Sequence, residues 1–71
     1  MADKATQPRR FIRIKEVLSI TSLSNSDLYR RIAAGTFPAQ INLGPMTVVW
    51  VEEEVRAWMD SRIAEARGVA A

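Results

Sequence analysis

IKEVLSITSLSNSDLYRRIAAGTFP, residues 14–38, is the stretch that decides the fold. Ile14, Val17 and Leu18 follow the i, i+3, i+4 spacing of one helix face. We therefore expect a first helix over residues 15–21. The hydroxyl residues that follow are typical of turns and helix caps, and they end this helix.

A second helix is expected over residues 25–34. Ser24 and Asp27 have the spacing of a capping box, with Asp27 in the positive first turn. Gly35 suits the C′ position, and Pro38 prevents the helix from resuming. Two short helices joined by a three-residue turn make a helix-turn-helix.

A β-hairpin and a third helix follow. Residues 40–43 and 47–51 are the expected strands, joined at Gly44-Pro45, and the helix is expected over residues 52–66. The expected inward residues of the strands are Ile41, Leu43, Val48 and Trp50. The expected inward stripe of the helix is Val55, Trp58, Met59 and Ile63. Residues 11–14 are β-prone but too few to form a strand alone.

This order predicts a mainly α fold with a small β-hairpin, a winged helix-turn-helix. We expect residues 1–8 to be a disordered tail, residues 9–67 to form the domain, and residues 68–71 to be a flexible end.

Composition argues against catalysis. The 71 residues include no histidine and no cysteine, which removes the usual general base, the usual nucleophile pairs and the usual zinc ligands. We expect no enzyme activity, no cofactor and no metal. The longest purely apolar run is residues 48–51, and we expect no membrane segment or signal peptide. The expected location is the cytoplasm, in association with the nucleoid.

Charge is unevenly distributed along the chain. Residues 1–50 carry seven Lys/Arg against three Asp/Glu, and residues 51–71 carry three against five, so the halves sum to +4 and −2. A basic front favours a polyanionic partner. The cations expected to contact a nucleic-acid backbone or enter a minor groove as an arm are Arg9, Arg10, Arg13 and Lys15. The alternative is a tail that only aids solubility.

On the second helix, Leu28 and Ile32 share the inward face. The opposite face carries small side chains around Arg30, whose guanidinium can read the O6 and N7 atoms of guanine. The predicted DNA-contacting residues are Asn25, Ser26, Asp27, Tyr29, Arg30 and Arg31, with Tyr29 and Arg31 expected at phosphates. The alternative is an ordinary solvated helix surface.

Two other groups have simpler explanations. The three carboxylates of residues 52–54 suit the positive end of a helix dipole better than a metal or acid-base site. Trp50 and Trp58 are expected to be core anchors, not platforms for stacked bases.

Taken in order, these residues resemble the AlpA family of phage and prophage regulators. The resemblance covers residues 9–67 and is carried by residues 10–17, Leu23-Ser24, residues 28–32, residues 35–38, Leu43-Gly44, Trp50, Glu54-Val55 and Trp58. It implies a MerR-like winged helix that regulates transcription, with Ser26, Tyr29 and Arg30 at recognition-helix positions. The implied wing residues are Gly44, Pro45, Met46 and Thr47.

Three positions depart from the pattern of the family. Many relatives have glycine where this chain has Ser22, so we expect this turn to avoid a left-handed residue. Relatives often have a basic residue where Asn25 and Met46 stand here.

The leading functional prediction is a sequence-specific DNA-binding transcriptional regulator of prophage or mobile-element genes. One alternative is an excisionase-type protein that bends DNA for recombination. Another, from a different class, is a winged helix used as a protein–protein adaptor. The expected partner is double-stranded DNA, bound by a homodimer or by tandem copies, because one small module buries only about 600–1,000 Å² on DNA. An integrase or RNA polymerase is a further possible partner.

Overall fold

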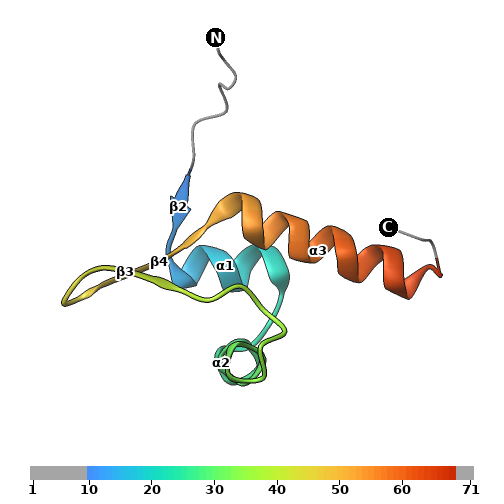
Figure 1. Ribbon diagram of the computed structural model, residues 1–71, viewed down its shortest axis with the longest axis horizontal. Helices are drawn as coiled ribbons and strands as arrows, with labels where there is room; N and C mark the ends of the chain where they lie inside the picture. The colour runs from blue at the N-terminus through green and yellow to red at the C-terminus, as the bar shows by residue number, and fades with distance from the viewer. Residues whose placement is uncertain (1–9, 69–71) are drawn as a thin grey trace, which may run out of the picture.

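The computed structural model describes residues 10–68 and has three helices and three short strands in that range (Figure 1). In chain order the elements are β2 (Phe11–Ile12), α1 (Ile14–Thr21), α2 (Asn25–Ala33), β3 (Ile41–Gly44), β4 (Thr47–Val51) and α3 (Glu52–Ala66). This order confirms the mainly α fold with a small β-hairpin. The predicted tail, residues 1–8, and residues 69–71 of the predicted flexible end lie outside the described residues.

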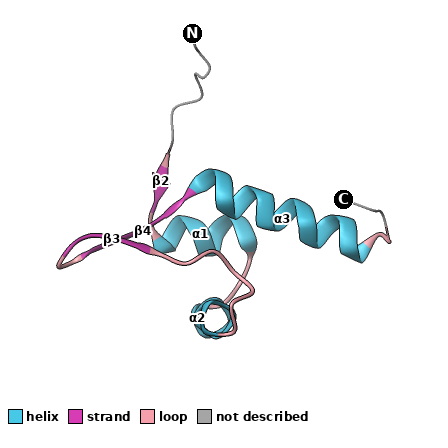
Figure 2. Cartoon of the chain, viewed as in Figure 1, coloured by secondary structure: helices cyan, strands magenta, loops and turns pink. Residues whose placement is uncertain are grey.

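The sheet has the strand order β2-β4-β3, with β4 in the centre (Figure 2). Both neighbours run antiparallel to β4, which pairs Phe11 with Val51 and Ile41 with Val49. The β-prone residues before α1 are therefore a strand after all, because the third strand gives them a partner. The hairpin of β3 and β4 projects away from the helices, and α3 extends to the opposite side (Figure 1).

Leu43 was expected to face the core, and this prediction is wrong. The pairing of β3 with β4 shifts between Asn42 and Gly44, so Leu43 has no residue opposite it. Such a bulge turns the side chain and breaks the in–out alternation on which the prediction depended. Leu43 is consequently 54% exposed.

The hydrophobic core lies where the sheet meets the helices. Its fully buried side chains include Val17 of α1, Leu28 of α2, Trp50 of β4 and Val55 of α3. Phe37, Val49 and Val51 are also buried and were not among the residues predicted to face inward. The predicted stripe of α3 is correct except at its end. Ile63 is 48% exposed because α3 continues beyond the body that its first turns cover (Figure 1).

The turn between α1 and α2 differs from the expectation. Ser22 has φ 62° and ψ 19°, the left-handed conformation that this turn was expected to avoid. Its N–H donates to the carbonyl of Leu18 at 2.8 Å and closes the last turn of α1. Serine here occupies a conformation that costs an L-residue roughly 1–2 kcal/mol.

The other predicted helix ends agree with the structure to within one residue. The Asp27 N–H donates to Ser24 Oγ at 3.1 Å, which confirms Ser24 as the N-cap of α2. Gly35 follows the C-cap with φ 77°, as its C′ assignment requires. Helix α1 begins one residue earlier than predicted, and α2 ends one residue earlier, at Ala33.

Candidate nucleic-acid interface

Helix α2 presents a polar, low-profile face to solvent. Leu28 is fully buried and Ile32 packs against the core, so the helix is oriented as its apolar spacing predicts. Asn25, Ser26 and Arg30 are exposed, and so are the small residues Ala33 and Ala34. Tyr29 is 42% exposed beside this face. An exposed helix of this kind, with few bulky side chains, fits the width of a major groove, about 12 Å.

Arg30 is paired with Asp27 one turn earlier. Arg30 Nη2 donates to Asp27 Oδ1, and the two side chains remain 68% and 40% exposed. The pair places a guanidinium and a carboxylate side by side on the exposed face of α2. An ion pair this exposed is weak, so both groups are available to a partner.

Arg31 lies against α3, unlike Arg30 on the exposed face of α2. Its guanidinium carbon lies 5.7 Å from the ring centre of Trp58 on α3, within the range of a cation–π contact. Its Nε is buried and has no hydrogen-bond partner among the described residues. The structure thus places Arg31 at the junction of α2 and α3, whereas the sequence predicted it at a phosphate.

Two indole groups hold the loop that follows α2. Trp58 Nε1 donates to the Thr36 carbonyl at 2.7 Å, and Trp50 Nε1 donates to the Pro38 carbonyl at 3.2 Å. Phe37, between them in sequence, packs edge-on against Trp58 with ring centres 4.8 Å apart. These contacts fix the end of α2 against the sheet and α3. The sequence predicted both tryptophans as core anchors, but not their hydrogen bonds to this loop.

The predicted basic arm divides into free and paired cations. Arg13 and Lys15 are exposed and have no carboxylate partner among residues 10–68. They line a shallow depression of about 490 Å³ between β2 and α1, together with Phe11 and Ser19. Arg9 lies outside the described residues.

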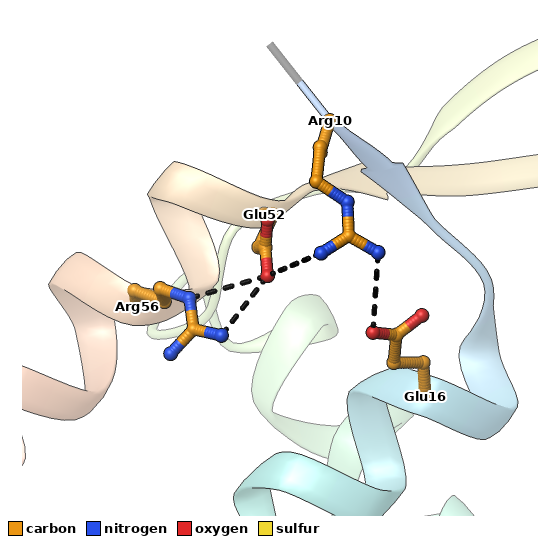
Figure 3. Close-up of polar contacts among 4 residues, drawn as sticks. All are labelled: Arg10, Glu16, Glu52 and Arg56. Carbon is orange, nitrogen blue, oxygen red and sulfur yellow. Dashed lines mark hydrogen bonds and ion pairs between the residues drawn. The ribbon is translucent and has the colours of Figure 1, made fainter. Parts of the chain in front are cut away.

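Arg10 belongs to a structural cluster (Figure 3). Its Nη1 donates to Glu52 Oε2 at 3.2 Å, and its Nη2 lies 3.6 Å from Glu16 Oε2. Arg56 Nε and Nη2 donate to the same Glu52 oxygen at 3.2 and 3.0 Å. Glu52 is buried, and its contacts join α3 to the residue before β2, which also reaches Glu16 of α1. Arg10 is therefore paired with carboxylates of the protein itself. Glu52 therefore does more than complement the dipole of α3.

The turn of the hairpin forms the wing. Gly44 pairs with Thr47 across it, and Pro45 and Met46 form its tip. Met46 is 89% exposed, and Leu43 is the exposed bulge residue beside it. The wing tip, defined here as Leu43, Pro45 and Met46, is apolar and points away from the core.

These elements define a class. A capped helix-turn-helix, an exposed second helix and a projecting hairpin make this a small winged helix-turn-helix protein. Across residues 10–68, no helix is long and apolar enough to cross a membrane.

The chain belongs to the AlpA family. Residues 10–63 match the family model described as Prophage CP4-57 regulatory protein (AlpA). The chain is also similar to Uncharacterized protein ORF88 of Enterobacteria phage P4, with 47% identity over 55 residues that cover 78% of this chain and 62% of that protein. No solved structure matches.

Proposed function

We propose that this protein is a sequence-specific DNA-binding regulator of prophage or mobile-element genes, with α2 in the major groove. The exposed α2 face, with Arg30 among small residues, is the observation that carries the proposal. Membership of a prophage regulatory family supports it. The activity of a whole regulator is part of the proposal, since the chain spans only 62% of its phage P4 relative.

Asp27 favours base reading over simple attraction to phosphates. A carboxylate facing DNA is repelled by every phosphate, so it lowers affinity for all sequences unless it meets a donor. Cytosine N4 is such a donor, and guanine O6 and N7 accept from arginine. We infer that Arg30 and Asp27 separate on binding and read neighbouring base pairs.

In this proposal few of the protein's cations are available to attract the DNA phosphates. Among the described residues Arg13 and Lys15 have no ion-pair partner, whereas Arg10 is paired and Arg31 is held against Trp58. If two to four phosphates are neutralised per copy, log K against log salt has a slope of about −2 to −4.

The test compares specific and non-specific DNA. The full chain selects its site from a duplex library with a randomised core, and fluorescence anisotropy then measures the Kd for the selected duplex and for a scrambled one. Arg30→Ala should weaken the selected duplex by about 1–3 kcal/mol and the scrambled duplex much less. Asp27→Ala should strengthen scrambled binding and weaken discrimination.

The matched control is Arg62 with Glu65, another i, i+3 ion pair that is exposed on α3. Arg62→Ala and Glu65→Ala make the same charge changes away from α2 and should alter both duplexes equally. Absence of binding to any duplex at low salt would refute the proposal, as would equal effects of Arg30→Ala and Arg62→Ala on discrimination.

A further inference from the structure

The wing lacks the charged side chains that usually clamp DNA. Residues 32–51, which contain the whole hairpin, include no Lys, Arg, Asp or Glu. Phosphate contacts come from basic and polar side chains and from N–H groups, and Pro45 at the tip has no N–H. The wing tip therefore has little to offer a phosphate, although it is the most exposed apolar part of the described chain.

The same tip has the chemistry of a minor-groove wedge. Met46 is 89% exposed and Leu43 is 54% exposed, and the bulge is what turns Leu43 outward. Proteins that kink DNA from the minor groove insert Leu, Met, Pro and similar apolar side chains between base pairs. A two-residue turn without charges also avoids bringing carboxylates close to the phosphates that border this groove.

The shape of the wing suits a narrow groove. The minor groove is about 6 Å wide, narrow enough to require a slim element such as a hairpin tip. The wing and α2 project separately from the body (Figure 1), so one copy has separate elements for a major groove and for the minor groove next to it.

We propose that the wing tip is an apolar wedge that enters the minor groove beside the α2 site and kinks the duplex by separating two stacked base pairs. The inference rests on the DNA binding proposed above. The favoured target is a pyrimidine–purine step, because such steps unstack most easily. This adds DNA bending to the proposed regulator and brings it closer to the excisionase-type activity.

The test uses a selected duplex of about 30 bp, three helical turns, with a fluorescent donor and acceptor at its ends. The wild-type chain should raise energy transfer as a kink of about 20–90° brings the ends together. It should also make thymines at one step reactive to permanganate, which attacks unstacked bases.

Met46→Ser and Leu43→Ser are the test variants, and Ile63→Ser is the control. Ile63 is 48% exposed, close to Leu43, but lies on α3. Met46→Ser should remove at least half of the change in energy transfer and the permanganate signal, while Kd changes by less than about tenfold. Ile63→Ser should bend DNA like the wild type. Circular dichroism and Tm confirm that each variant is folded.

The outcomes separate the two proposals. Tight binding by the wild type with a straight duplex would overturn the wedge and leave the DNA-binding function intact. An unchanged kink in Met46→Ser, accompanied by loss of binding of a second copy, would also overturn it, because the wing would then contact protein. Absence of binding to any duplex would overturn both.

Discussion

Ser22 offers a direct test of the helix-turn-helix turn. It has φ 62° although it is not glycine, and its side chain is exposed with no hydrogen bond among the described residues. Its contribution to the turn is the backbone N–H that donates to Leu18, which glycine retains. We therefore expect Ser22→Gly to stabilise the protein.

The size of the effect is a difference of two backbone terms. Relief of the left-handed strain is worth roughly 1–2 kcal/mol, and the added freedom of glycine in the unfolded chain costs about 0.4–1 kcal/mol. The balance is about 0.8 kcal/mol in favour of Ser22→Gly. For a domain of this size that raises Tm by about 3–6 °C.

Gly35→Ala is the mirror experiment. Gly35 has φ 77°, and a Cβ built there meets no atom within 4 Å, so the substitution adds backbone strain without a steric clash. It should lower Tm by a similar amount, for the same reason with the opposite sign. Ser22→Ala keeps the strain and should leave Tm nearly unchanged.

Thermal unfolding followed by circular dichroism measures all three variants, and urea unfolding gives the free energies. A Ser22→Gly variant with unchanged or lower stability, beside the expected loss in Gly35→Ala, would refute the strain argument at this turn. If Ser22→Ala matched the gain of Ser22→Gly, the hydroxyl would be the cause and not φ.

Three further predictions concern the contacts that position the site. Glu52→Gln should lower the free energy of unfolding in urea by about 1–3 kcal/mol, because two arginines lose a buried carboxylate. Glu65→Gln, at an exposed pair, should change it by less than about 0.5 kcal/mol. Equal losses in the two variants would contradict this prediction. Trp58→Phe should cost about 1 kcal/mol because the Thr36 carbonyl loses its donor, and unchanged unfolding would contradict it. Arg31→Met should leave the slope of log K against log salt unchanged, whereas Arg13→Met should make that slope less steep by about 1. A less steep slope in Arg31→Met would show that Arg31 contacts a phosphate.

Helix positions follow from local chemistry and could be predicted from the sequence. Ser24 caps α2 through a residue three positions away, and Gly35 ends it through its own φ. The burial of Leu28 follows from spacing along one helix. Each of these depends on interactions within one or two turns, which sequence spacing describes directly.

The errors arise where distant segments decide the outcome. Leu43 is exposed because β4 imposes a bulge, and the pairing register is not encoded in alternation alone. Ile63 has helical spacing, but no element lies over that end of α3 (Figure 1). Ser22 is the exception, because its closing hydrogen bond to Leu18 is local and holds a conformation that serine does not prefer.

In the candidate site, too, local contacts could be predicted from the sequence and contacts between distant segments could not. The sequence identified Arg10 and Arg31 as candidate cations, but only the fold shows that Arg10 meets Glu52, from 42 residues away, and that Arg31 meets Trp58. The first contact pairs Arg10 with a carboxylate, and the second holds Arg31 against an aromatic ring, where it keeps its charge. The Asp27–Arg30 pair is local and was within reach of i, i+3 reasoning, since the two residues are one turn apart.

The paired arginines bear on how many copies act together. With Arg10 and Arg30 in ion pairs, residues 10–68 of one copy offer few free cations near the proposed DNA site, and a module of this size buries about 600–1,000 Å². Weak backbone attraction keeps single-copy affinity low and makes it depend on the base contacts, so a mismatch costs a large share of it. A second copy roughly doubles the area and the free charge without new chemistry, and a kink at each wing would also help to bring neighbouring copies together. We therefore expect high affinity only for duplexes with two sites about one helical turn apart, and affinity that falls steeply when half a turn is inserted between them.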